Sequence, residues 1–304
     1  MPYFLTLLSL VFLIACSDTK EEQTVTTQKQ PNKIKERVVY VSNVHDIETL
    51  FNDLNYTSST WKEGNREVPR IYFTSVSKKW KDVSSSLPVK TKKNIFFRVM
   101  APLILMSNEA ITKERQQLLQ GKLNAPSTIA LAKRYRVIKK ETTALNKEQY
   151  QELLKRVDIV PVSLALAQAA EESGWGTSRF ASEGNAFFGL WDFSGKGMAP
   201  AQQRKELGNY GLARYKTPLD SVKGYMYNIN IGHAYEKFRN KRFELRQSKK
   251  KITGWELAKT LDKYSERGQA YIDGLHAMMK YNKLQAADDA YLLNDQIIHL
   301  KRIP

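Results

Sequence analysis

The sequence has 304 residues, of which 42% are hydrophobic and 11% aromatic, and its formal net charge is +17. This composition excludes a largely disordered chain, because there are enough apolar side chains to bury a substantial core. A single cysteine excludes an internal disulfide framework. The basic charge favours a polyanionic partner, unless it is only a basic surface with no particular partner.

The N-terminus resembles an export signal. An apolar run from Tyr3 to Ala15 is too short to span a bilayer and fits the hydrophobic region of such a signal. Leu13-Ile14-Ala15-Cys16 resembles a bacterial lipobox, so we expect residues 1–16 to hold the signal and Cys16 to be lipidated. Ser17 then favours the periplasmic side of the outer membrane of a Gram-negative bacterium, by analogy with enteric lipoproteins. The alternative is an ordinary secretory signal in which Cys16 has no role.

Two segments separate this signal from the main body of the chain. Residues 17–36 are almost devoid of apolar side chains and are predicted to form a disordered tether. Residues 37–88 are an N-terminal extension in which 37–41 and 68–76 are predicted strands and 45–54 is a predicted helix. We see no chemistry in these segments.

A helical scaffold is predicted from Val89 onward. Residues 89–120 have an apolar helical face, and Pro102 is expected to kink this helix or divide it in two. A second helix is predicted at 127–136. A third begins at Asn146, where Gln149 nearly completes a capping box.

The stretch from Asp158 to Trp191 is the most informative part of the sequence. An alanine-rich helix is predicted to start near Pro161 and to end at Gly174, with Glu171 and Glu172 in its last turn. The negative end of the helix dipole and burial should both raise the pKa of a carboxyl there. A carboxylic acid that stays protonated near neutral pH can donate a proton to a leaving oxygen. The alternative is a solvated glutamate pair without a chemical role.

The residues after this helix combine tight turns with aromatic rings, which suits a carbohydrate-binding cleft. The run Glu172-Ser-Gly-Trp-Gly176, followed by Asn185 and Phe188-Gly189, resembles glycoside hydrolase family 73. This family comprises bacterial β-N-acetylglucosaminidases that cut peptidoglycan. Within it, the sequence is similar to the Bax-type proteins, which are relatives of the flagellar peptidoglycan hydrolases.

The resemblance implies roles for individual residues. It selects Glu172 over Glu171 as the general acid, a choice that helical phase alone leaves open. Tyr264 matches a tyrosine that lines the catalytic site in relatives, and Tyr271 matches the second tyrosine after a short turn. The expected substrate-binding residues are Trp175, Asn185, Phe188, Gly189, Trp191 and Tyr271.

A second catalytic group is expected from a small β lobe at residues 190–217. Glu206 is the candidate for positioning the attacking water or balancing charge, and Asp192 is its competitor. Either acid could instead only pair with Arg204 or Lys205. Glu266 lies in a turn that departs from the family pattern and is a possible third acid.

The resulting prediction is an α+β, mainly α, lysozyme-like domain at 89–284, with a small β lobe that forms a substrate cleft. Residues 285–304 are predicted to be a C-terminal helical tail. No cofactor and no metal site are expected, since His233 has no cysteine or carboxylate neighbours at ligand spacing.

The predicted function is hydrolysis of the β-1,4 bond after N-acetylglucosamine in peptidoglycan strands. Besides a second carboxylate, the substrate's own N-acetyl group could assist the reaction. The predicted partners are peptidoglycan and, through Cys16, a membrane, but not nucleic acid, because the sequence has no such motif and carries an export signal. A lytic transglycosylase and a non-catalytic wall-binding lipoprotein remain alternatives, although Gly189-Leu190 is followed by Trp191-Asp192 rather than by the usual transglycosylase signature.

Overall fold

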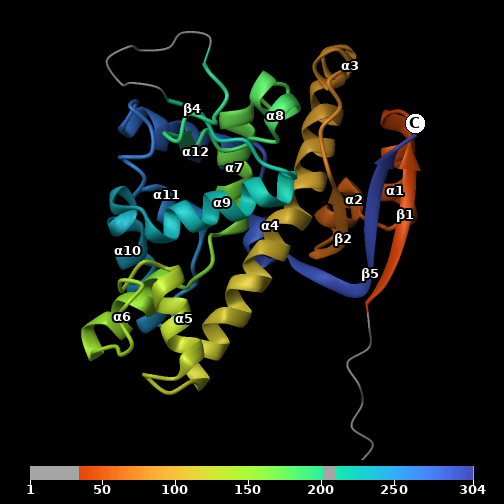
Figure 1. The fold of residues 1–304 in the computed structure, drawn as a ribbon. Helices are drawn as coiled ribbons and strands as arrows, with labels where there is room; N and C mark the ends of the chain where they lie inside the picture. Colours follow the sequence, from red (N-terminus) through yellow and green to blue (C-terminus); the bar gives the residue numbers. More distant parts are fainter. Residues whose placement is uncertain (1–33, 201–209, 304) are drawn as a thin grey trace, which may run out of the picture. The chain divides into compact units, whose positions relative to one another are not determined.

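The computed structural model describes residues 34–200 and 210–303, and its mainly helical α+β fold confirms the predicted class (Figure 1). Cys16, Glu206 and residues 17–33 of the predicted tether lie outside the described residues, so the predictions that depend on them stay predictions. Lys35 and Glu36 belong to a strand, so the predicted disorder is wrong for these last two residues of the tether. The helices are α1 (Val44–Asp53), α2 (Ser58–Lys62), α3 (Trp80–Ser86), α4 (Val89–Gln120), α5 (Pro126–Arg134), α6 (Lys147–Arg156), α7 (Val162–Ser173), α8 (Arg179–Gly184), α9 (Pro218–Ile231), α10 (Glu236–Gln247), α11 (Gly254–Ala258) and α12 (Gln269–Tyr281). The 3-10 turns η2 (His233–Tyr235) and η3 (Leu284–Asp289) and the strands β1 (Lys35–Val41), β2 (Glu67–Phe73), β3 (Trp191–Asp192), β4 (Gly211–Leu212) and β5 (Tyr291–Arg302) complete the described elements.

Helix α4 separates the three-stranded sheet from helices α5 to α12. Figure 1 shows the sheet on one side of α4 and helices α5 to α12 on the other. The helix is continuous over its 32 residues, so the expectation that Pro102 would divide it is wrong. Pro102 is buried between Ala101 and Leu103, and packing on both sides of the helix compensates for the hydrogen bond that a proline cannot make. By length and composition α4 could also cross a membrane, but most of its apolar stretch is buried inside the protein.

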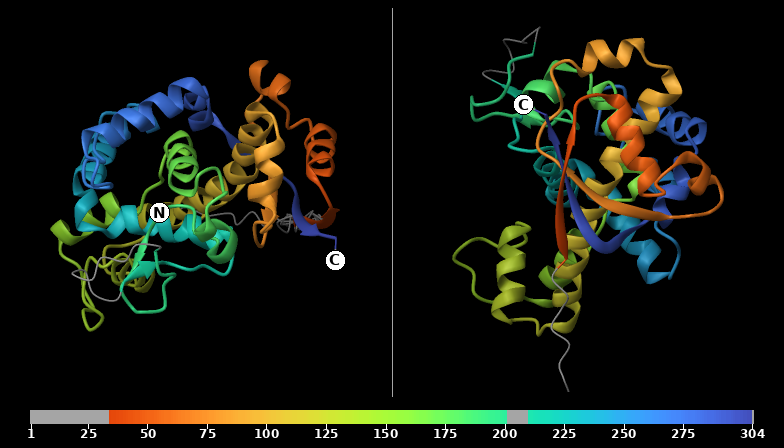
Figure 2. Two further views of the ribbon diagram at one scale, coloured as in Figure 1. Left: turned by 90° about the horizontal axis from the view of Figure 1, so that it is seen from above. Right: turned by 90° about the vertical axis from the view of Figure 1, so that its right-hand side faces the viewer.

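The C-terminal tail is a strand, so the predicted helix at 285–304 is wrong. Strand β5 lies between β1 and β2, and both pairings are parallel (Figure 2, right). Leu300 is opposite Val39 and Phe73, and Ile298 and Leu300 are buried in the core. The tail adopts this conformation because both of its edges find hydrogen-bonding partners far away in the chain, which local helical periodicity does not reveal. The N-terminal extension and the tail therefore form one sheet.

The start of α7 is fixed by a carboxylate from η3. Asp288 accepts hydrogen bonds from the Ser163 amide and hydroxyl, both at 2.9 Å, and from the Gly254 amide at 2.8 Å. These bonds satisfy amide groups at the first turns of α7 and α11, which have no partner within their own helices. A Cβ on Gly254 would lie 2.2 Å from the Ser163 Oγ, so the two helices can approach this closely only with a glycine there.

The predicted β lobe is present as a two-stranded antiparallel sheet. Trp191 pairs with Leu212 and Asp192 with Gly211, and a further bridge joins Met198 to Leu212. In the sequence, the lobe connects α8 to α9.

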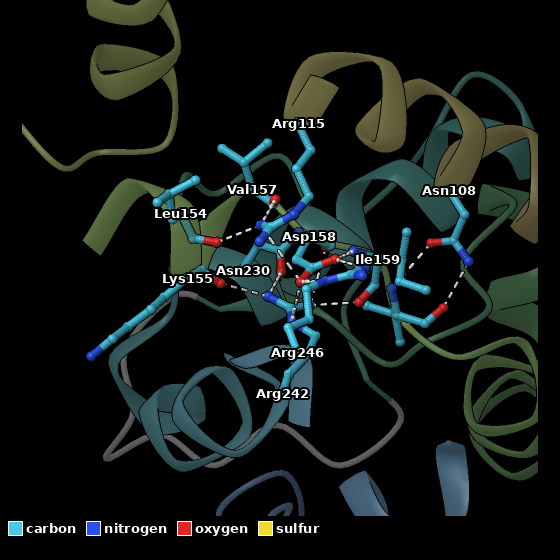
Figure 3. A network of polar contacts seen from close by, with 11 residues as sticks. Asn108, Arg115, Leu154, Lys155, Val157, Asp158, Ile159, Asn230, Arg242 and Arg246 are labelled. Carbon is cyan, nitrogen blue, oxygen red and sulfur yellow. Dashed lines mark hydrogen bonds and ion pairs between the residues drawn. The ribbon is translucent and has the colours of Figure 1, made fainter. Parts of the chain in front are cut away.

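A buried carboxylate, Asp158, fixes the connection between α6 and α7 (Figure 3). Arg246 donates two hydrogen bonds to it, both at 2.5 Å, and Arg115 approaches it at 3.6 Å. Arg242 is fully buried and donates to the carbonyls of Lys155, Asp158 and Ile159. These guanidinium groups thus gather around one carboxylate and the carbonyl-rich C-terminal end of α6.

The charges in this network are mutually dependent. Burial alone would raise the pKa of Asp158, but the Arg246 hydrogen bond and the positive charges of Arg242 and Arg115 hold it below the usual range. Burial lowers the pKa of Arg242 to about 10. Asp158 therefore stays ionised and neutralises part of a buried positive charge.

We expect Asp158→Asn to destabilise the protein by about 3–5 kcal/mol, because it leaves buried guanidinium groups without their counter-charge. Since folding lowers the Asp158 pKa, its contribution is present above about pH 3.9, the unfolded value, and is lost as pH falls further. Urea unfolding measures the change, with Glu244→Gln in the surface Lys241 pair as a control that should cost far less. Equal effects of the two substitutions would contradict a structural role for the buried network.

Candidate active site

Three consecutive left-handed residues turn the chain sharply after α7. The φ angles are 56° at Gly174, 63° at Trp175 and 76° at Gly176. Gly174 is the predicted end of the helix. A tryptophan with left-handed φ and ψ angles is uncommon, so the surroundings of Trp175 must stabilise this conformation. The Trp80 indole donates to the Trp175 carbonyl at 3.0 Å, and the Ser173 hydroxyl accepts from the Gly176 amide at 2.9 Å.

The Trp175 side chain packs against α4. Its ring centroid lies 5.7 Å from that of Phe96 and 5.2 Å from that of Phe97, and the Lys93 ammonium lies 4.9 Å above the ring. These contacts anchor the turn to the core, which is a structural role that we had not predicted for Trp175. Its expected contact with substrate stays a prediction.

Glu172 lies in the last turn of α7 with its two oxygens in different surroundings. Oε1 accepts a hydrogen bond from the Tyr271 hydroxyl at 2.7 Å. Oε2 faces Gly189, where a Cβ would lie only 3.0 Å away. Gly189, with a φ of 62°, thus leaves room beside Oε2 that any side chain would fill.

Burial raises the pKa of Glu172, and the negative charge of Glu171 adds to this effect. The Tyr271 hydrogen bond and the positive charge of Arg267 act in the opposite direction, but the net shift is upward. A carboxyl in this position can hold a proton at a pH where an ordinary glutamate is ionised, as the sequence predicted from its place on the helix.

Glu171 has a different environment from its neighbour. It is exposed, and its Oε1 accepts a hydrogen bond from Arg267 at 2.8 Å. The geometry therefore distinguishes the two adjacent acids, which helical phase alone did not.

The two predicted tyrosines stack on each other, with parallel rings 5.5 Å apart. Tyr271, which we expected to bind substrate, is the one that contacts Glu172. Tyr264, which we expected to be catalytic, donates its hydroxyl to the Phe188 carbonyl at 2.9 Å. Burial raises the pKa of both hydroxyls, so both stay protonated. Tyr264 supports the Phe188-Gly189 turn, and Tyr271 is the closer of the two to the candidate chemistry.

Two expected substrate-binding side chains are buried. The Phe188 ring is 2% exposed and stacks on Tyr225 with centroids 4.0 Å apart, so it cannot form the aromatic wall that we expected. The Asn185 amide donates to the carbonyls of Tyr215 at 3.2 Å and Lys216 at 3.0 Å, joining α8 to the segment before α9. Trp191, by contrast, is 54% exposed on β3 and is free to contact a ligand.

The structure describes two of the three candidate second acids, Asp192 and Glu266, and their surroundings differ. Asp192 accepts a hydrogen bond from the Ser194 amide at 2.8 Å, and the hydrogen bonds from Ser194 lower its pKa, so it is ionised. Glu266 is exposed in the turn between Tyr264 and Arg267. Among residues 34–200 and 210–303, no group of three or more His, Cys, Asp or Glu side chains could hold a metal ion.

Comparison with known proteins identifies the family. Residues 147–284 match the family model Glucosaminidase, described as mannosyl-glycoprotein endo-beta-N-acetylglucosaminidase. Protein bax of Escherichia coli (strain K12) is 35% identical over 215 residues, which cover 66% of this chain and 76% of that protein. The chain belongs to the Bax-type glucosaminidase family. No solved structure matches it.

Membership of the Bax-type glucosaminidase family supports a glycosidase that acts on a glycan. Glu172, Gly189, Tyr264 and Tyr271 all lie within the matched residues 147–284. Trp80 lies outside them, yet it holds the turn that follows Glu172. No local pattern in the sequence indicates this contact, since it joins residues 95 positions apart.

We expect Trp80→Phe to lower the free energy of unfolding by about 1 kcal/mol more than Trp61→Phe, because it also removes the hydrogen bond to the Trp175 carbonyl. Trp61 is a suitable control because it is also half-buried, and the Arg66 guanidinium 4.5 Å from its ring still meets an aromatic face in the phenylalanine variant. Urea unfolding of both variants gives the comparison. Equal losses would show that the indole bond contributes nothing to the turn.

Proposed function

We propose that this Bax-type glucosaminidase is a peptidoglycan hydrolase of glycoside hydrolase family 73, related to the flagellar peptidoglycan hydrolases. In this proposal it cleaves the β-1,4 bond after N-acetylglucosamine. The observation that carries the proposal is the environment of Glu172, a half-buried carboxyl with a raised pKa within the matched residues 147–284. Such a group has the proton and the position that a glycosidase acid requires.

In the proposed mechanism Glu172 protonates the leaving glycosidic oxygen, and positive charge develops on the N-acetylglucosamine ring. The Tyr271 hydroxyl stabilises the carboxylate that remains, because it already donates to Oε1. On the other face of the sugar, water is activated by a second carboxylate or the substrate's N-acetyl group assists. Asp192, Glu206 and Glu266 are the candidate carboxylates, and ionised Asp192 is suited to balancing the developing positive charge.

The charge of the molecule supports an acidic glycan as the substrate. Six lysines and one acidic residue, Asp82, occur between Lys78 and Lys93, in the segment that forms α3 and the start of α4. Trp80, within this segment, contacts the turn after Glu172. Lys93, the last of these lysines, lies 4.9 Å from the Trp175 ring in that turn. We infer that the lysines of this segment attract the carboxylates of peptidoglycan stem peptides.

The proposed location is the periplasmic side of the outer membrane, with a lipid anchor at Cys16. The support for this is the lipobox-like sequence Leu13–Cys16 and the polar residues that follow it. A lipid anchor followed by the predicted tether would let the domain reach the cell wall while it stays at the membrane.

We expect Glu172→Gln to lower the rate of sacculus digestion at least 100-fold, because an amide cannot donate the proton that general acid catalysis requires. Glu171→Gln, one residue away, should keep most of the activity because Glu171 is exposed and paired with Arg267. Products are reduced with borohydride and identified by mass spectrometry. Reduced N-acetylglucosamine ends are the result that the proposal requires.

Other products would identify one of the two alternatives. Anhydro-muramic ends would assign the protein to the lytic transglycosylases. Binding to sacculi without any soluble product, by a correctly folded protein, would favour a wall-binding lipoprotein. Equal activity of the Glu172→Gln and Glu171→Gln variants would contradict the assignment of the acid.

The pH profile should reflect the raised pKa of Glu172. The acid form is lost as pH rises through this pKa, so activity should fall on the alkaline side at a pH above about 4.3, the ordinary value for glutamate. Glu171→Gln removes a charge that raises this pKa and should move the alkaline limb to lower pH. Arg267→Gln removes a charge that lowers it and should move the limb to higher pH. Initial rates across a pH series measure both shifts, and limbs that do not move would contradict the assignment.

A further inference from the structure

A chain of buried hydrogen bonds connects Glu172 to the core. The Tyr271 hydroxyl donates to Glu172 Oε1 at 2.7 Å, and Gln168 Nε2 donates to the Tyr271 oxygen at 3.0 Å. The Tyr225 hydroxyl in turn donates to Gln168 Oε1 at 2.6 Å. Gln168 and Tyr225 are 0% exposed and Tyr271 is 1% exposed. Gln168 lies one helical turn before Glu172 on α7, whereas Tyr225 and Tyr271 come from α9 and α12.

The direction of these bonds is fixed by the amide of Gln168. An amide has one acceptor end and one donor end, and Tyr225 occupies the acceptor end. The donor end therefore points at the Tyr271 oxygen, and the single Tyr271 proton is directed to Glu172 Oε1. A carboxyl oxygen that accepts this hydrogen bond cannot also carry its own acidic proton on the side that faces Tyr271. Two hydrogen atoms would then lie between oxygens only 2.7 Å apart.

We propose that Gln168, oriented by Tyr225, is a positioning residue that keeps the acidic proton of Glu172 on Oε2. Oε2 is the oxygen beside Gly189, where the missing side chain leaves room for a ligand. This inference rests on the proposed role of Glu172 as the acid and adds which of its oxygens donates the proton. The network thus places the proton on the side of the carboxyl that faces Gly189 and not on the side that faces Tyr271.

Gln168→Leu tests this directly, because it keeps the approximate size of the side chain and removes both ends of the amide. The Tyr271 hydroxyl could then rotate and accept the Glu172 proton on Oε1, where it cannot reach the substrate. We expect kcat on soluble glycan strands to fall about tenfold with KM unchanged. The alkaline limb should move to higher pH, since the protonated carboxyl gains an acceptor in Tyr271, while the Tyr271 hydroxyl that donates to the ionised carboxyl is no longer polarised by Gln168.

Tyr225→Phe is the milder second variant, because it removes one hydroxyl and leaves the amide of Gln168 free to turn over. It should shift kcat and the alkaline limb in the same directions by a smaller amount. The double variant should be no worse than Gln168→Leu alone, since both substitutions break one chain. Tyr227→Phe, on the same helix, is the matched control. Its hydroxyl donates to the Arg134 carbonyl, away from this chain, so it should move neither quantity.

A readout that needs no turnover separates this inference from the proposed function. The ¹³C signal of the Glu172 carboxyl, assigned with Glu172→Gln, is titrated in the wild type and in each variant. The other groups that act on this carboxyl are Glu171, Arg267 and the protonated tyrosines Tyr225, Tyr235 and Tyr264, and the Gln168→Leu exchange keeps all of them. The inference predicts that Glu172 titrates at higher pH in Gln168→Leu and Tyr225→Phe, even if the protein does not digest peptidoglycan.

Two results would overturn the inference. One is an unchanged Glu172 titration in Tyr225→Phe. This test can still be made if the Gln168→Leu variant does not fold. The other is a double variant whose effects on kcat equal the product of the two single effects, because independent residues and not a connected chain would behave in this way. Loss of digestion in every variant and in the wild type, with the titration shifts present, would count against the proposed function alone.

Discussion

The hydrogen bond between Tyr271 and Glu172 is the interaction on which the candidate site depends. Burial at the end of α7 raises the pKa of this carboxyl, and one donor from α12 stabilises its ionised form without cancelling that effect. A general acid needs this compromise, because it must hold a proton before the reaction and tolerate its loss afterwards. The surrounding helices serve to keep α7 and α12 at the distance that makes this bond possible.

Segments far from the matched residues 147–284 support this arrangement. Strand β5, near the C-terminus, pairs with strands from the N-terminal extension, and α4 packs against the resulting sheet and against α7. Trp80 then reaches from α3 to the left-handed turn after Glu172. The extension and the tail are therefore structural parts of the domain, and the site should be studied in a chain that contains both.

Local patterns in the sequence predicted the helical scaffold, the capping box at Asn146, the end of α7 at Gly174 and the unusual position of Glu172. Long-range pairing was not predictable in the same way. The tail has no local feature that favours a strand until β1 and β2 lie on either side of it, and Phe188 looks like a ligand-stacking ring until Tyr225 covers it. Which of Tyr264 and Tyr271 contacts Glu172 was not predictable for the same reason, since only the packing of α12 on α7 decides which hydroxyl reaches the carboxyl.

The most direct test of the account is a crystal structure of the Glu172→Gln variant with a bound peptidoglycan tetrasaccharide. The account predicts that the glycosidic oxygen on the reducing side of an N-acetylglucosamine lies about 3 Å from the side-chain atom of residue 172 that faces Gly189. Tyr271 should remain bonded to the other atom of that side chain. A sugar chain bound away from the end of α7, or one that meets residue 172 only on the Tyr271 side, would contradict the account.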